Sequence, residues 1–128
     1  MELSIQAIAD EKIKAMNNKI ILTLRELGVP AHLEGYEYLK DAFQICLDDA
    51  KAIRSVTKNI YPQIAKSFET TPRRVERAIR HAIEVAWDRG DLEVFARFFG
   101  NSISPDRGKP TNSEFIATVV EAIRMEQS

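Results

Sequence analysis

Apolar residues recur every three or four positions along most of this chain, which is the spacing of helices with one buried side. The clearest case is the segment from Gly35 to about Asp49, whose apolar stripe consists of Leu39, Ala42, Phe43, Cys46 and Leu47. Similar spacing predicts a helix up to about Leu27, with Asn17 and Asn18 as its weakest point. Gly28 and Pro30 follow and end it. No segment alternates convincingly as a strand does, and we predict an all-α fold.

Shorter helices are expected after residue 50. Ile53, Val56 and Ile60 continue the apolar spacing as far as Pro62. Because proline is favoured in the first turn of a helix, Pro62 predicts a new helix start, with an end near Phe68.

The second half of the chain contains three more predicted helices. Thr71 fits an N-cap with Pro72 behind it, and this helix extends to about Trp87. A short helix covers residues 92–99, and residues 101–110 form a loop. Residues 111–114 (Thr-Asn-Ser-Glu) are a capping box that opens a last helix. The residues of this last helix expected to face the core are Phe115, Ile116, Val119, Val120 and Ile123.

Residues 64–81 indicate a helix-turn-helix, around which the six or so helices are arranged. Ile64, Ala65 and Phe68 fit its first helix, where a small residue allows close approach, and Val75 fits the buried anchor of the second. The second helix places Val75, Ala78, Ile79 and Ala82 on its inner side. Its outward residues are Arg73, Arg74, Arg77, Arg80 and His81.

This outward side favours DNA binding. The planar fork of arginine can donate to guanine O6 and N7 together, and Glu76 can accept from cytosine N4. The chain has a net charge of −1, from 18 Lys and Arg against 19 Asp and Glu. Residues 73–80 nevertheless contain four arginines and one glutamate, while acids gather at 10–11, 34–41 and 48–49. The charge is therefore polarised, which a nucleic-acid-binding protein needs more than a positive sum.

Composition narrows the classes of protein to which this chain can belong. A chain of 128 residues with 45% hydrophobic content can fill the core of one domain. Cys46 is the only cysteine, which excludes an intramolecular disulfide and a zinc site of the Cys/His type. No leader-like N-terminus or apolar run of about 20 residues is present, so we expect a cytoplasmic, nucleoid-associated protein without a membrane partner. No cofactor, metal or small-molecule substrate is expected.

Other interpretations stay open. Arginines on a helix are often a solvated face with pairs such as Glu76–Arg80, and a helix-turn-helix can also be a protein-interaction module that binds an acidic partner. His81 and Glu84, with His32 distant in sequence, form no catalytic or metal-binding set, so we do not expect an enzyme. Cys46 and Trp87 are interpreted as core residues.

Two runs, residues 74–87 (RVERAIRHAIEVAW) and 109–117 (KPTNSEFIA), carry a resemblance that spans about residues 22–126. The sequence resembles the C-terminal effector domain of the stage-zero sporulation protein A family, the master response regulators of endospore-forming bacteria. The resemblance implies an all-helical domain that binds short TGTCGAA-like boxes, activating some promoters and repressing others. It also implies tandem copies on adjacent DNA boxes.

The resemblance also implies roles for residues. Base contacts fall on Arg74, Glu76 and Arg77. The residues expected near the DNA or at its phosphates are Lys58, Lys66, Thr70, Thr71, Arg73, Arg80, His81 and Lys109. The family's contact surface for an RNA polymerase sigma factor corresponds to residues 90–103, where only Phe99 and Gly100 match. The candidates on that surface are Asp91, Glu93, Arg97 and Phe98.

The sequence departs from the family at several positions. Glu34 stands where lysine is usual, Glu69 where asparagine is frequent, Asp88 where serine is common, and Arg73 where a small polar residue is usual. Nothing in residues 1–27 is expected to supply the family's receiver domain, so the chain is either an excised effector region or a free-standing effector. We divide it into an N-terminal helical extension or linker remnant, 1–20, and the helix-turn-helix effector domain, 21–128.

Overall fold

The computed structural model describes residues 4–100 and 108–127, and in these ranges it contains helices and no strands. The α-helices are α1 (Ile5–Glu26), α2 (Glu34–Asp48), α3 (Tyr61–Ser67), α4 (Pro72–Arg89), α5 (Leu92–Phe99) and α6 (Asn112–Gln127). The predicted all-α class with about six helices is confirmed.

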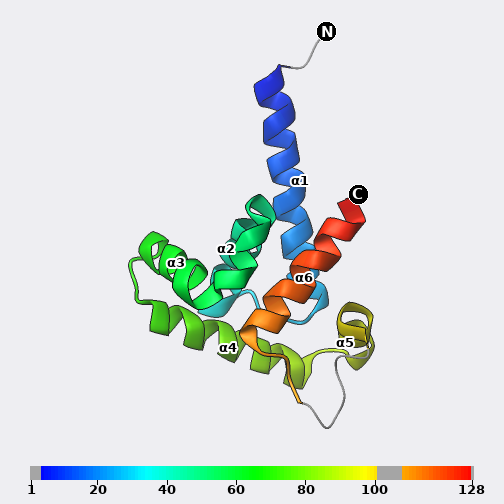
Figure 1. Cartoon of the computed structure of the whole chain (residues 1–128). Helices are drawn as coiled ribbons and strands as arrows, with labels where there is room; N and C mark the ends of the chain where they lie inside the picture. The colour runs from blue at the N-terminus through cyan, green and yellow to red at the C-terminus, as the bar shows by residue number, and fades with distance from the viewer. Residues whose placement is uncertain (1–3, 101–107, 128) are drawn as a thin grey trace.

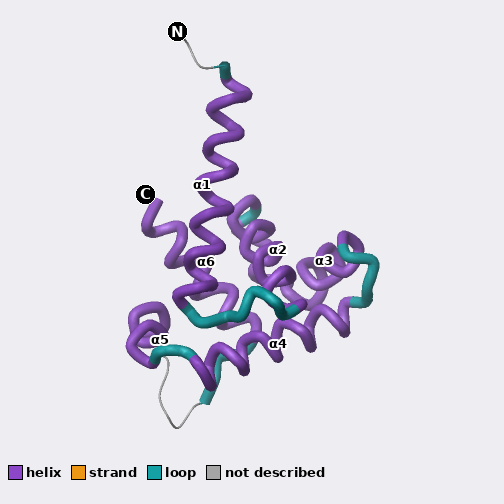
Figure 2. Tube along the Cα trace, turned by 180° about the vertical axis from the view of Figure 1, so that it is seen from behind, coloured by secondary structure: helices purple, strands orange, loops and turns teal. Residues whose placement is uncertain are grey.

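Helix α4 lies across one end of the molecule, and α2, α3 and α6 all contact the same side of it (Figure 1). α5 lies beside the C-terminal end of α4. α1 begins at the opposite end and projects away from the other helices, which the view from behind shows equally well (Figure 2). The side of α4 that faces away from α2, α3 and α6 is therefore accessible along the whole helix.

The core lies where α2, α4 and α6 meet. Phe43 from α2, Ile79 from α4 and Phe115 from α6 are all fully buried, and the rings of Phe43 and Phe115 stack with centroids 6.3 Å apart. The five residues of α6 that were predicted to face the core are all buried. On α2 the predicted stripe is buried as far as Cys46, while Leu47 is partly exposed.

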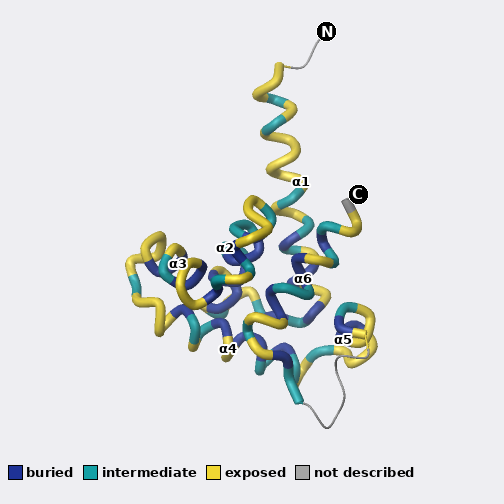
Figure 3. The backbone as a smooth tube through the Cα atoms, in the orientation of Figure 1, coloured by how far each residue is buried: buried dark blue, intermediate teal, exposed yellow. Residues whose placement is uncertain are grey.

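α1 differs from its prediction because it continues through Asn17 and Asn18 without a break. Only its C-terminal half joins the core, through Ile20, Leu24 and Leu27, and its N-terminal half is exposed (Figure 3). The proposed boundary at residues 20–21 falls inside this helix and stays a prediction.

The connection between α2 and α3 is a 3₁₀ segment, η1 (Ala50–Ser55), followed by a π-helical turn, η2 (Val56–Ile60). Pro62 is in the first turn of α3, as predicted. Proline lacks an N–H and its ring clashes with the carbonyl four residues earlier, which disfavours regular α-helix across this point. The N–H of Tyr61 donates instead to the carbonyl of Val56, five residues back, and the turn is widened.

Candidate nucleic-acid interface

The predicted helix-turn-helix consists of α3, a turn over residues 68–71, and α4 (Figure 2). α3 ends in a Schellman motif, in which Thr70 N–H donates to the carbonyl of Ala65 at 2.9 Å and Glu69 N–H donates to Lys66 at 3.4 Å. This motif requires a left-handed residue, and Glu69 supplies it with φ 53°. The turn geometry is therefore formed without the glycine or asparagine that usually serves there.

The start of α4 is fixed by the predicted N-cap. The Thr71 hydroxyl accepts from Arg74 N–H at 3.2 Å, and Pro72 follows at the first helical position. Val75 is fully buried and anchors α4, while Ala65 of α3 is 3% exposed at the close approach of the two helices. Phe68 is 41% exposed and packs edge-on against Tyr38, with ring centroids 5.0 Å apart.

The arginines of α4 lie on its accessible side, as predicted. The exposed residues there are Arg73, Arg74, Arg77, Arg80 and His81, whereas Val75, Ile79 and Ala82 on the opposite side are buried and Ala78 is partly buried. The three residues to which base contacts were assigned do not point in one direction. Arg74 and Glu76 are about 200° apart around the helix axis because successive residues turn by about 100°. Arg77 lies between them, at the centre of the exposed side.

An open hollow of about 740 Å³ lies between the first turn of α2 and the N-terminal half of α4. Basic side chains dominate its lining. Those from α4 are Arg73, Arg74, Arg77 and His81, and His32 comes from the loop before α2. The two histidines, which are distant in sequence, therefore lie at the same hollow. Its acidic member is Glu34, which stands in the first turn of α2.

Glu34 forms an ion pair with Arg74 across this hollow. Arg74 Nη2 donates to Glu34 Oε1 at 3.1 Å and Arg74 Nε donates to Glu34 Oε2 at 3.4 Å. The Tyr38 hydroxyl donates to Glu34 Oε2 at 3.3 Å. The hydrogen bond from Arg74 is the main reason that the pKa of Glu34 is lowered, and the same bond raises the pKa of Arg74.

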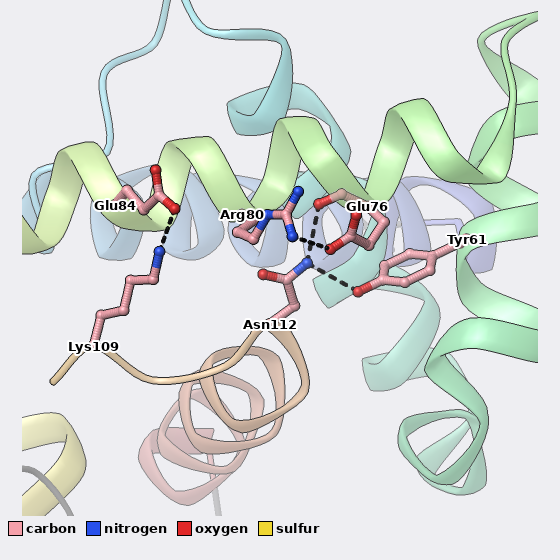
Figure 4. Close-up of polar contacts among 6 residues, drawn as sticks. All are labelled: Tyr61, Glu76, Arg80, Glu84, Lys109 and Asn112. Carbon is pink, nitrogen blue, oxygen red and sulfur yellow. Dashed lines mark hydrogen bonds and ion pairs between the residues drawn. The ribbon is translucent and has the colours of Figure 1, made fainter. Parts of the chain in front are cut away.

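The other flank of α4 faces α6 and the segment before it (Figure 4). Glu76 pairs with Arg80 at 3.5 Å between Oε1 and Nη1. Lys109 pairs with Glu84, and this hydrogen bond is the main cause of the lowered pKa of Glu84. Three of the predicted DNA-binding residues, Glu76, Arg80 and Lys109, are thus engaged in ion pairs with neighbours along this flank.

Asn112 connects this flank to the rest of the molecule. Its side-chain nitrogen donates to the hydroxyl of Tyr61 in α3 at 3.0 Å and to the backbone carbonyl of Glu76 in α4 at 3.1 Å (Figure 4). The predicted capping box is present beside it, because Glu114 N–H donates to the Thr111 hydroxyl at 3.1 Å and the Glu114 carboxylate accepts from Thr111 N–H at 3.0 Å. Asn112, the first residue of α6, therefore connects α6 to both α3 and α4.

The remaining basic candidates flank the helix-turn-helix. Lys58 lies in η2 and Lys66 in the last turn of α3, and both are exposed. Across residues 4–100 and 108–127, neither lysine has an ion pair with an acidic side chain. Thr70 is partly exposed in the turn.

The residues predicted for a sigma-factor surface lie on or beside α5, at the far end of α4 (Figure 1). Asp91 is the N-cap of α5 and its carboxylate accepts from Glu93 N–H at 2.8 Å. Arg97 pairs with Glu26 of α1 at 2.6 Å, and Phe98 is partly buried. Residues 101–103 of the predicted surface lie outside the described residues.

The structure gives Cys46 the environment of a core residue. It is 1% exposed, and burial raises the pKa of its thiol to about 11, which keeps it protonated near neutral pH. Among the described residues, no group of three or more His, Cys, Asp and Glu side chains could hold a metal ion. Trp87 packs against Phe95 with ring centroids 5.3 Å apart, as an anchor next to the core.

None of the helices in the described part of the chain has the length and apolar character to cross a membrane.

An all-α domain in which the second helix of a helix-turn-helix exposes several arginines is typical of the helix-turn-helix class of DNA-binding domains. The family model described as "Sporulation initiation factor Spo0A C terminal" matches residues 20–123. The chain belongs to this family of DNA-binding effector domains of sporulation response regulators, and the resemblance carried by its sequence is confirmed.

Two residues of this site were missed by sequence reasoning. Glu34 was noticed as a departure from the family, but its partner Arg74 is 40 positions away and no local pattern connects them. Asn112 was assigned only to the capping box. Its two bonds to other helices depend on tertiary packing, although its place at the first residue of a helix was visible in the sequence.

Proposed function

We propose that the chain regulates transcription by inserting α4 into the major groove of short TGTCGAA-like DNA boxes. The observation that carries this proposal is the exposed side of α4, with Arg77 at its centre and further basic side chains on both flanks. An α-helix fits the width of the major groove, and arginine makes the commonest specific contact there, with guanine. The capped start of α4 and the bonds from Asn112 support a rigid presentation of this side.

We assign base contacts to Arg74, Glu76 and Arg77. Arg77 is the best placed, because it lies between the two flanks and has no carboxylate in pairing distance among the described residues. Glu76 is paired with Arg80, and its contact with a cytosine would require that Arg80 turn toward a phosphate. Such an exchange keeps both groups paired.

Phosphate contacts are assigned to residues around the base-reading side chains. They are Lys58, Lys66, Thr70, Thr71, Arg73, Arg80, His81 and Lys109. The exposure of Lys58 and Lys66 supports this role, and contacts of this kind set position and orientation without selecting sequence. Lys109 would exchange Glu84 for a phosphate.

Membership of the family supports three finer proposals. Two copies bind side by side on adjacent boxes, the bound domain acts as activator at some promoters and repressor at others, and the surface around α5 contacts a sigma factor. Asp91, Glu93, Arg97 and Phe98 are the residues proposed for that surface. The protein would act on the nucleoid in the cytoplasm.

The experiment that tests base contact is a titration of Arg77→Lys and Arg77→Ala on two duplexes at fixed salt. One duplex contains the box and the other has its guanine replaced. Arg77→Lys keeps the charge and loses the planar fork, so cognate binding should weaken by roughly 1–3 kcal/mol while non-specific binding changes little.

Two results would count against the proposal. An unchanged preference for guanine in Arg77→Lys would remove Arg77 from the base contacts. Equal binding of the wild-type chain to the box and to a scrambled duplex would favour a module for acidic protein partners instead, because such a surface treats all duplexes as similar polyanions.

A further inference from the structure

The pair between Glu34 and Arg74 uses one edge of the guanidinium group. Glu34 accepts from Nε and from Nη2, which are the two nitrogens of the side edge. Arginine has five N–H donors in a rigid planar fork. Three donors remain, and one from Nη1 together with the second from Nη2 forms the outer edge of the group. That outer edge has the geometry for two parallel hydrogen bonds to guanine O6 and N7.

The Glu34 carboxylate has a second donor in addition to Arg74. The Tyr38 hydroxyl, one turn along α2, donates to the same carboxylate. The backbone at Gly35 lies against the carbonyl of Ala78 in α4, so closely that a Cβ at Gly35 would overlap it. The close packing of α2 on α4 at Gly35 therefore fixes the position of Glu34 relative to α4, and the Tyr38 hydroxyl orients its carboxylate.

We propose that Glu34 is a positioning residue that sets the sequence specificity of the domain, by holding Arg74 through its side edge so that its outer edge faces a guanine. This inference rests on the proposed function. An unpaired arginine on a helix surface samples many rotamers, and ordering it on binding costs free energy. A pre-oriented fork avoids part of that cost only where its acceptors are in the right place, which is at the correct base.

The negative charge of Glu34 also lowers the affinity of the domain for DNA in general. A carboxylate beside the groove repels phosphates of every duplex alike, which weakens binding to DNA that offers no guanine at this position. At the correct base the orientation of Arg74 compensates for this repulsion. The orientation of Arg74 increases the ratio of cognate to non-specific affinity, whereas the repulsion alone lowers the affinity for every duplex to the same extent.

The test compares Glu34→Gln with wild type on the box, on a scrambled duplex and on boxes with single base replacements. Affinity for the scrambled duplex should rise, whereas the ratio between cognate and base-replaced duplexes should fall by roughly two- to fivefold, the range that an exposed ion pair is worth. Glu37→Gln is the matched control, because it removes an exposed carboxylate from the same helix and leaves the Arg74 pair intact. It should leave the ratio unchanged.

A double-mutant cycle separates positioning from a general charge effect. In an Arg74→Ala background, Glu34→Gln should no longer change the preference for any base. If Glu34 merely competes with DNA for Arg74, then Glu34→Gln raises cognate affinity at least as much as scrambled affinity, and the inference is overturned. It is also overturned if Arg74→Ala leaves every base preference intact, although the proposed function then survives through Arg77. A wild-type chain without any sequence preference would overturn both.

Discussion

Gly35 is the point at which α2 comes closest to α4, and its replacement by alanine tests the packing that positions the interface. A Cβ at this position would meet the carbonyl oxygen of Ala78 well inside 3.0 Å and the Cβ of Ala82 at 2.7 Å, whereas ordinary contact begins at 3.4 Å. The backbone carbonyl belongs to a helix and cannot rotate away. To accommodate one methyl group, the two helices must therefore separate by about 1 Å.

The cost of this separation exceeds the gain from helix propensity. Alanine is favoured over glycine by about 1 kcal/mol inside a helix, and by less at a position as close to the N-terminus as Gly35. Forcing additional atoms into a well-packed contact costs about 1–3 kcal/mol, and the buried residues Leu39 and Phe43 on the same helix resist any shift of α2. We expect a net destabilisation of about 1–2 kcal/mol, which lowers the Tm by roughly 4–7 °C for a domain of this size.

Thermal unfolding, followed by the helical signal in far-UV circular dichroism, measures this change in Tm. Glu37→Ala is the control, because it introduces the same residue on an exposed position of the same helix and should shift the Tm little. An equal or higher Tm for Gly35→Ala would refute the reasoning, since propensity alone predicts that sign. It would mean that α2 and α4 are not in close backbone contact.

Three further outcomes are expected. Glu69→Gly should raise the free energy of unfolding by about 1 kcal/mol, measured by urea denaturation, because Glu69 has φ 53° and glycine adopts such a conformation without steric cost; a lower stability would contradict the strain. Lys66→Ala should flatten the slope of log K against log salt by about one unit and leave base preference intact, and a changed preference would disprove a simple phosphate contact. Without DNA the domain should be monomeric in analytical ultracentrifugation, while two adjacent boxes bind two copies with cooperativity that is lost when half a helical turn is inserted; indifference to spacing would count against tandem binding.

Local patterns accounted for most of the helices. The one-sided stripe of α2, the Thr71 N-cap and the capping box at Thr111 each follow from interactions between residues no more than four positions apart. Such interactions leave a signature in sequence spacing. The π-helical turn before Pro62 was not predicted, because proline disfavours regular α-helix at this point but does not determine which other conformation replaces it.

In the candidate site, too, local features could be predicted from the sequence and contacts between distant residues could not. That Arg73, Arg74, Arg77 and Arg80 point outward follows from the period of α4 alone. The pair of Arg80 with Glu76 also follows from that period, whereas the pair of Arg74 with Glu34 does not, since Glu34 comes from another helix. Asn17 and Asn18 show the opposite error, in which weak local propensity predicted a weak point that the helix does not have. Asparagine is less favourable in a helix by only a few tenths of a kcal/mol per residue. Such a difference does not interrupt a helix when the residues on both sides are already helical.

The ion pairs around α4 also explain how a chain with a net charge of −1 can present a surface for DNA. Glu34 of α2 neutralises Arg74 on one flank of α4, and on the other flank Glu84 of α4 itself pairs with Lys109 from the segment before α6. Arg77 and Arg73, on the central part of the exposed side, have no such partner in the described ranges. Unpaired positive charge is thereby concentrated on the middle of the exposed side and reduced at its edges. In the proposed interface, fewer unpaired cations would lower the general affinity for DNA, which depends on phosphate contacts, without removing the base contacts proposed for Arg74 and Arg77.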